Sequence, residues 1–263
     1  MTSMSDAVSD STTMLRRSLR HIVRYPSMTL MLVGIPIVFL LLFVYVFGGT
    51  LGAGLGAVSG GRADYVNYVA PAIILMTVAA VAQGTAISVA MDMTAGIIAR
   101  FRTMAITRAS VLTGHVLASM IQTMLSLAVV IGVALGIGFR PTAGPMEWFA
   151  AIGVLALITL ALTWLSVALG LISKSVETAS NLPMFLVLLP FLGSGFVPTD
   201  SMPAGLRWFA AYQPFTPVID TLRGLLLGAP IGSNAAIAVG WCACIALLAY
   251  LWAKRLFNRR PAH

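Results

Sequence analysis

Residues 92–108 have the sequence DMTAGIIARFRTMAITR and separate two long apolar stretches that carry almost no charge. This segment, called here the basic island, contains one acidic residue and three arginines: Asp92, Arg100, Arg102 and Arg108. A polar segment of this length cannot remain in hydrocarbon, so it must emerge into water. Apolar residues recur between the charges at helical spacing: Ile97, Ile98, Phe101 and Ile106. The island is therefore either a short surface helix that binds a partner or a solvated loop between two spans.

The composition places the chain among membrane proteins. Of its 263 residues, 59% are hydrophobic and 9% are charged, whereas soluble domains carry about 25% charged residues. The formal charge of +8 is spread over the ends of apolar runs, which is typical of membrane anchoring and not of nucleic-acid binding. Cys242 and Cys244 lie inside an apolar run and offer neither a disulfide framework nor metal-ligand spacing. We predict an all-α polytopic membrane protein.

Six apolar runs are candidates for transmembrane helices, since about 20 residues are needed to cross hydrocarbon. They are residues 28–47, 66–91, 111–139, 148–172, 181–197 and 235–253. The fifth contains Pro183 and Pro190, which remove backbone hydrogen bonds and should bend it. The glycine-rich residues 48–61 are predicted to form a loop.

Two further helical regions flank these spans. In residues 11–25, leucines and isoleucine share one side of a helix and Arg16, Arg17, Arg20 and Arg24 share the other, which favours a helix in the membrane interface over an ordinary soluble helix. Residues 198–228 are predicted to form a re-entrant helical hairpin before the last span. One helix covers 204–212, and the second has Thr216 as its cap, Pro217 at its first position and Gly228 at its end. Asp220 and Arg223 are three residues apart there, so their side chains can meet.

Positive residues are divided unevenly between the two sides of the predicted membrane. With the N-terminus inside, four of the 16 lysines and arginines fall outside, and they are Arg62, Arg140, Arg207 and Arg223. The other twelve fall in the N-terminal helix, the basic island, the turn at Lys174 and the C-terminal tail. This bias predicts that both termini and the basic island face the cytoplasm.

Several motifs in this order resemble the type-2 ABC exporter permease family, and its daunorubicin/doxorubicin-resistance branch most closely. The resemblance covers nearly the whole chain. Its most specific parts are Gly195-Phe-Val-Pro198, Met202-Pro203, Leu206, Pro214-Phe-Thr-Pro217, Asp220 and Arg223-Gly224. Family members similarly carry an acidic residue, glycine and arginines in the coupling helix, which correspond here to Asp92, Gly96, Arg100 and Arg102. Where the family usually has a proline before the last arginine of that loop, this chain has Met104-Ala105-Ile106, so the local backbone path differs.

The resemblance implies a single transmembrane permease domain over residues 1–263, with a cytoplasmic tail and interfacial helix (1–26), a six-span core (27–253) and a cytoplasmic tail (254–263). It implies a lipid-embedded half-transporter of the bacterial plasma membrane. A second permease copy, identical or not, and two ABC ATPase subunits holding ATP and Mg would complete it. The expected ATPase-coupling residues are Asp92, Gly96, Ile97, Arg100, Phe101, Arg102 and Arg108. The expected hairpin residues are Pro198, Pro203, Pro214, Pro217, Asp220 and Arg223.

The chain itself is not expected to hydrolyse ATP or to need a cofactor. It has no G-x-x-x-x-G-K-[ST] sequence, and Lys174 follows a serine in place of the glycine that cradles phosphates. An intramembrane enzyme is disfavoured because His21, His115 and His263 are far apart in sequence and no carboxylate pair lies within a span.

The nearly uncharged spans suit a lipophilic or amphipathic cargo, such as a drug, lipid or polyketide-like molecule, exported by alternating access. Gln83, Gln122 and Asn181 are candidates for lining its path, or equally hydrogen-bond partners between packed helices. A polysaccharide or glycolipid exporter of the same architecture remains an alternative. An ion-coupled carrier or channel without an ATPase is a further one, although it should show ionisable residues inside its spans.

Overall fold

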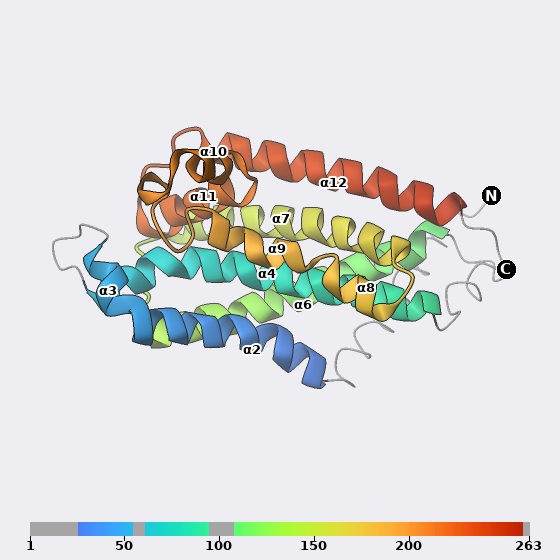
Figure 1. The fold of residues 1–263 in the computed structure, drawn as a ribbon, viewed down its shortest axis with the longest axis horizontal. Coiled ribbons are helices and arrows are strands. Elements are labelled where there is room, and N and C mark those ends of the chain that lie inside the picture. The colour runs from blue at the N-terminus through green and yellow to red at the C-terminus, as the bar shows by residue number, and fades with distance from the viewer. Residues whose placement is uncertain (1–25, 55–60, 95–107, 260–263) are drawn as a thin grey trace.

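The computed structural model describes residues 26–54, 61–94 and 108–259, and all secondary structure in these ranges is helical. The predicted interfacial helix at 11–25 and most of the basic island lie outside the described residues. The helices run roughly parallel along one long axis (Figure 1). The described residues form the apolar bundle that the sequence predicts, together with two short helices before the last long helix.

The first apolar run is a continuous helical segment with a change of pitch. It consists of α2 (Pro26–Leu42), a π-helical turn (Phe43–Phe47) and α3 (Gly48–Ala53). The prediction of a loop from residue 48 is wrong for its first part, because α3 continues the helix. Gly48 and Gly52 are buried, and a Cβ on Gly52 would collide with the backbone of Gly61. These glycines permit close chain approach, a role that composition alone cannot distinguish from loop formation.

Four long helices correspond to the predicted second, third, fourth and sixth spans. They are α4 (Arg62–Thr94), α6 (Arg108–Gly136), α7 (Pro145–Ile172) and α12 (Asn234–Arg259). The third ends three residues before its predicted end, since the chain turns at Gly138, whose φ is 116°. α4 is the central helix. In its most apolar 18-residue stretch 83% is buried, compared with 17% in the corresponding stretches of the first and last spans.

The predicted fifth span is broken into short pieces, as its two prolines predict. They are α8 (Val176–Asn181), α9 (Met184–Leu188) and a 3-10 turn (Leu189–Leu192). Pro183 precedes α9, and Pro190 lies in the 3-10 turn. At about 1.5 Å per residue, Val176–Leu192 covers about 25 Å, somewhat less than the hydrocarbon core of about 30 Å. Within the described residues, five helices are long and apolar enough to cross a membrane, so the predicted number of six spans is not confirmed.

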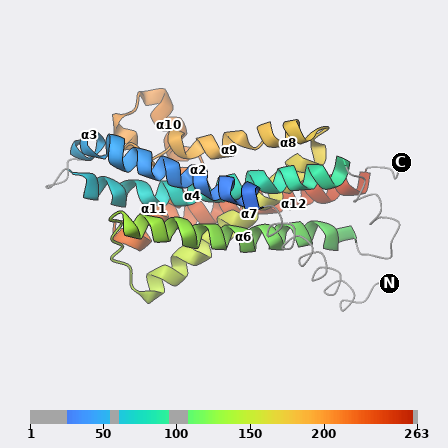
Figure 2. The same cartoon turned by 90° about the horizontal axis from the view of Figure 1, so that it is seen from below.

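The hairpin region follows. A short 3-10 turn (Thr199–Ser201) leads to α10 (Ala204–Tyr212), which has its predicted bounds, and to α11 (Phe215–Leu227). α11 ends at Gly228, which adopts the left-handed conformation with φ 73°, as expected of a C-terminal glycine. Figures 1 and 2 place α3, α10 and α11 at one end of the bundle, called here the hairpin end. The end of α4, the start of α6 and the end of α12 lie at the other, called here the island end.

Candidate functional site

The predicted contact between Asp220 and Arg223 is present on α11. Arg223 Nη1 donates a hydrogen bond of 2.8 Å to Asp220 Oδ1. The arginine side chain is 15% exposed and the aspartate side chain 26% exposed, so the pair is half-buried at the hairpin end. A charge at such a site depends on its partner, because removing one leaves the other poorly solvated.

Ser194 joins this ion pair to the rest of the bundle through three polar groups. Its hydroxyl donates to Asp220 Oδ1 at 2.7 Å, and its backbone N–H donates to the hydroxyl of Thr216 at 3.3 Å. Its carbonyl accepts from Arg223 Nη2 and from the Tyr68 hydroxyl, both at 2.9 Å. Tyr68 belongs to α4, so this cluster connects the central helix, the Gly193–Gly195 turn and α11.

The structure assigns Thr216 a different role from the predicted helix cap. α11 begins at Phe215, with Pro214 as the residue before it and no side-chain cap. The Thr216 hydroxyl instead accepts from Ser194 N–H and from Gln213 Nε2. Gln213 Nε2 also donates to the carbonyl of Leu189 in the broken fifth segment, at 3.1 Å. The hydroxyl is thus used for contact between segments and not for the end of its own helix.

Two glycines beside Ser194 explain how the turn comes so close to α11 and α4. A Cβ on Gly193 would lie 2.6 Å from the Thr216 hydroxyl, and one on Gly195 would lie 2.8 Å from the Ala72 Cβ. Both distances are below ordinary van der Waals contact, so larger residues would push the turn outward. The two glycines therefore let the backbone come close enough for the hydroxyl, N–H and carbonyl of Ser194 all to bond to protein groups.

The predicted hairpin prolines occupy the starts of its helical pieces. Pro198 precedes the 3-10 turn and Pro203 precedes α10. Pro214 precedes α11, and Pro217 lies buried in its first turn, where a missing N–H removes no helical hydrogen bond. Three of the four prolines thus directly precede a helical piece, and the polar cluster holds α11 against α4.

Only the two edges of the basic island are described. Asp92 lies in the last turn of α4, and its Oδ2 is 3.2 Å from Nε2 of the buried His115 on α6. Arg108 is the first residue of α6. The other predicted coupling residues, which lie outside the described residues, are Gly96, Ile97, Arg100, Phe101 and Arg102.

Two of the three candidate pathway residues lie on one side of α4. Gln83 Nε2 donates to the carbonyl of Ser180 at 2.7 Å, which places it against α8 beside the exposed Asn181. Gln122 is on α6 and half-buried. The structure therefore brings Gln83 against Ser180, the neighbour of Asn181 in sequence, and leaves Gln122 on another helix.

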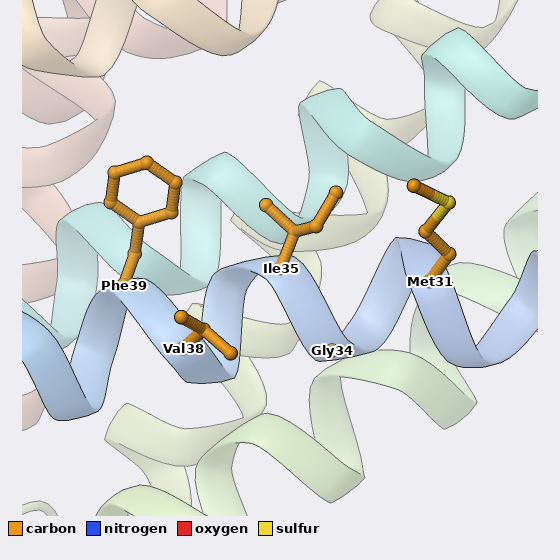
Figure 3. Close-up of a pocket in the computed structure, with 5 residues that line it drawn as sticks. All are labelled: Met31, Gly34, Ile35, Val38 and Phe39. Carbon is orange, nitrogen blue, oxygen red and sulfur yellow. The ribbon is translucent and has the colours of Figure 1, made fainter.

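An open apolar pocket lies on α2, on the flank that meets the fifth segment. It is lined by Met31, Gly34, Ile35, Val38 and Phe39 (Figure 3). At its far end, the Phe39 ring contacts Phe191 of the 3-10 turn, with 5.5 Å between centroids. Phe191 in turn stacks on Phe196 at 4.3 Å. The pocket carries no ionisable side chain and suits an apolar side chain, a lipid tail or a lipophilic molecule.

Within the described part of the chain, no group of three or more histidine, cysteine, aspartate or glutamate side chains could hold a metal ion. Sequence reasoning identified Asp220 and Arg223 but missed Ser194, Tyr68 and the pairing of His115 with Asp92. A serine between two glycines beside a proline-broken helix was a usable signal for Ser194. Tyr68 and His115 offered none, since their partners are distant in sequence.

Comparisons with known proteins find two ABC transporter permeases and a nodulation protein. The chain is 27% identical to the daunorubicin resistance ABC transporter permease protein DrrB1 of Streptomyces coeruleorubidus, over 98% of this chain and 89% of that protein. It is 25% identical to the probable doxorubicin resistance ABC transporter permease protein DrrC of Mycobacterium tuberculosis, over 64% and 61% of the two chains. It is 26% identical to nodulation protein J of Rhizobium meliloti over 82% of each.

The ABC-2 type transporter family model matches residues 10–227. That range contains the island between α4 and α6 and the helix pair α10–α11 with its polar cluster. With most of the chain matched and the helical bundle in place, the chain belongs to the ABC-2 type transporter family.

Proposed function

We propose that this chain is the transmembrane subunit of an ATP-driven exporter that moves a lipophilic, drug-like cargo out of the cytoplasm or the inner leaflet. The observation that carries the proposal is the similarity to DrrB1 along 98% of the chain, within a matched ABC-2 type transporter family. The physical character of the bundle supports it, because its long helices are apolar and bury few ionisable groups. An ion-coupled carrier would need such groups along its path.

The energy for export comes, in this proposal, from two separate ABC ATPase subunits that bind ATP and Mg. They dock on the basic island, with Ile97 and Phe101 as apolar anchors and the arginines as partners for acidic residues. Interfaces favour this mixture of aromatic residues and arginine. Gly96 lets the backbone approach closely. The full set of proposed docking residues is Asp92, Gly96, Ile97, Arg100, Phe101, Arg102 and Arg108.

We infer a topology of six crossings with both termini in the cytoplasm. The twelve-to-four distribution of lysine and arginine supports this orientation. An even number of crossings requires that the broken segment Val176–Leu192 crosses the membrane as well, and its apolar character supports this. The island end is then cytoplasmic and the hairpin end faces outward. Residues 11–25 lie in the inner interface, and α10–α11 re-enter the membrane from outside.

The pathway forms, in this proposal, between two permease copies that meet across the α2 flank. This flank combines the apolar pocket of α2 with the half-buried Gln83 and the exposed Asn181 on neighbouring helices. The exposed side chains of Met31 and Val38 supply apolar contact area. Such a surface gives a mainly apolar passage with a few amides for orientation.

The test is purification of the tagged chain from its native membranes, followed by reconstitution into liposomes. Daunorubicin serves as the probe, because the similar protein DrrB1 is named as a daunorubicin resistance permease. We expect a copurifying polypeptide with a nucleotide-binding motif, Mg-dependent ATP turnover that the probe stimulates, and ATP-dependent movement of the probe. Purification without any ATPase, or turnover that no lipophilic probe alters, would contradict the proposal.

A further inference from the structure

We propose that the Asp92–His115 pair fastens the end of α4 to the start of α6, so that force applied to the island moves both helices as one unit. His115 is then a positioning residue for energy coupling. The inference rests on the proposed function, in which an ATPase acts on the island. The inference goes beyond the proposed function, because it assigns the transmission of force to residues inside the bundle.

The first observation is the geometry of the pair. Residues 95–107 join α4 to α6, and Asp92 and His115 lie on either side of that connection. Their side chains meet at 3.2 Å, with the histidine 8% exposed and the aspartate 14% exposed. A contact this sheltered from water keeps more of its strength than an exposed pair. The pair therefore links α4 to α6 next to the segment that connects them.

A second set of polar contacts joins α4 and α6 further along the same two helices. Ser119 lies one turn beyond His115 on α6, and Thr85 lies two turns before Asp92 on α4. The Thr85 hydroxyl donates to the Ser119 hydroxyl at 2.7 Å. The Ser119 hydroxyl is 3.4 Å from that of Thr163 on α7. All three residues are buried. Polar contacts therefore join α4, α6 and α7 within two helical turns of the Asp92–His115 contact.

α7 is held against α4 at the same level by close backbone packing. A Cβ on Gly170 of α7 would lie 2.7 Å from the Ala86 carbonyl and 3.0 Å from the Val89 Cβ. Helices that approach this closely cannot slide independently without losing packing. The contact thus adds a third helix to the unit formed by α4 and α6.

An apolar cluster completes this unit and includes α12. Its buried members are Val89, Leu112, Val116, Trp164, Val167, Ala168, Leu171, Ala249, Ala253 and Phe257. Trp164 of α7 also meets Tyr250 of α12 edge to face, with 4.9 Å between ring centroids. Among the residues that the structure describes, none from α2, α8 or α9 belongs to this cluster. The island is therefore attached to a group of four helices, α4, α6, α7 and α12, that share this cluster.

This arrangement gives the Asp92–His115 contact a mechanical consequence. If α4 and α6 could separate at the island, movement of residues 95–107 would be absorbed locally. With the pair closed, the same movement passes to α4, α6, α7 and α12 together. α4 also shares a buried core with α2 and α9, and its Gln83 donates to the Ser180 carbonyl of α8. The movement therefore reaches the helices beside the proposed pathway.

The experiment compares two substitutions at one site. His115→Gln keeps a side-chain N–H near the position of Nε2, whereas His115→Leu keeps similar volume without a donor. Thr159→Val is the control for loss of a buried polar group, because the Thr159 hydroxyl bonds only to Leu155 of its own helix. Each complex is purified from native membranes. The measurements are the amount of copurified ATPase, ATP turnover, and daunorubicin molecules moved per ATP hydrolysed.

We expect His115→Leu to retain the ATPase at the wild-type level but to lower the molecules moved per ATP by about fivefold or more, the scale of typical coupling between sites. His115→Gln and Thr159→Val should keep the wild-type ratio. If His115→Leu lowers only the yield and melting temperature of the complex and leaves the ratio unchanged, the pair merely satisfies buried polar groups and the proposal is wrong.

A second measurement needs no ATPase and so separates failure of this inference from failure of the proposed function. Spin labels are placed at the exposed Met91 and Leu117, on α4 and α6 beside the pair, after Cys242 and Cys244 are replaced by serine. In the permease alone, we expect one narrow distance distribution that broadens in His115→Leu and stays narrow in His115→Gln. An unchanged distribution in His115→Leu would show that the pair does not hold the helices together.

Discussion

Tyr68 on α4 and Arg223 on α11 lie face to face and share one acceptor. The Arg223 Cζ atom is 4.1 Å from the centroid of the Tyr68 ring, and both side chains donate to the carbonyl of Ser194 at 2.9 Å. Nη2 of the arginine also donates to the Tyr68 carbonyl at 3.2 Å. A lysine could not reproduce this arrangement, because its compact ammonium lacks the planar fork of guanidinium.

The first prediction follows from this shared acceptor. Arg223→Ala should lower the melting temperature of the purified chain and impair export, since it removes the ion pair, the ring contact and two hydrogen bonds to carbonyls. We expect a cost of about 2 kcal/mol, less than the 3–5 kcal/mol of fully buried pairs because both side chains are partly exposed. Arg223→Lys should recover only part of it.

The control is Arg207→Ala on α10, where the arginine is exposed and bonds backbone carbonyls of its own loop. It should behave as wild type. Exchange of the two charges, with Asp220→Arg and Arg223→Asp together, should restore part of the loss. Wild-type export by Arg223→Ala would mean that this arginine is only a solvated anchor.

Features of the fold that depend on local composition can be located from the sequence pattern alone. Uncharged runs gave the positions of the long helices, because hydrophobic length is a local property. The prolines at 183 and 190 predicted the broken fifth segment. Gly48–Ala53 is helical although a loop is predicted there. Glycines that permit close approach of two segments and glycines that permit a turn cannot be distinguished from composition.

The candidate site was predicted only where its members are neighbours in sequence. Asp220 and Arg223 are three residues apart, so helical geometry sufficed. Tyr68 and Arg223 are 155 residues apart, and their contact depends on how α4 packs against α11. The Asp92–His115 pair likewise depends on packing between two helices whose relative rotation the sequence does not determine.

The second prediction concerns orientation and rests on the charge bias. In a chain without Cys242 and Cys244, single cysteines introduced at Gly56 and Ala143 should react with a membrane-impermeant thiol reagent in intact cells. Cysteines at Ser5 and Ala262 should react only after the cells are permeabilised. Reaction of Ser5→Cys in intact cells would overturn the proposed topology.

The third prediction concerns the second copy. Val38 lines the α2 pocket and is exposed, so Val38→Cys in the same background should form a disulfide-linked dimer when native membranes are treated with a membrane-permeant oxidant. Leu125→Cys is the matched control, because Leu125 is similarly exposed but lies on α6. Dimers from Leu125→Cys, with none from Val38→Cys, would move the interface to the α6 side of the bundle.

The fourth prediction compares two glycines of α7. A Cβ on Gly170 would lie 2.7 Å from the Ala86 carbonyl, whereas one on Gly153 would meet nothing within 4 Å. Gly170→Ala should therefore lower the melting temperature by forcing α7 away from α4. Gly153→Ala should leave it unchanged or raise it, because alanine favours a helix by about 1 kcal/mol over glycine. Equal melting temperatures for the two variants would show that α7 and α4 can separate at little cost.

The last prediction returns to the basic island. Phe101→Ala should reduce copurification of the ATPase and abolish probe-stimulated turnover, since loss of an aromatic anchor at the centre of an interface costs about 2 kcal/mol or more. Arg100→Glu with Arg102→Glu should weaken the same capture, and most clearly at low salt, where charge contacts are least screened.

These variants differ from His115→Leu in what they disturb. The island substitutions should lower the amount of bound ATPase, whereas His115→Leu should leave it bound and lower the cargo moved per ATP. The same purification therefore separates docking from transmission, provided that every variant inserts into the membrane at the wild-type level. If Phe101→Ala and the double arginine variant retain both ATPase capture and stimulated turnover, the island is only a connection between α4 and α6. The motor would then dock elsewhere, and the Asp92–His115 pair would have no force to transmit.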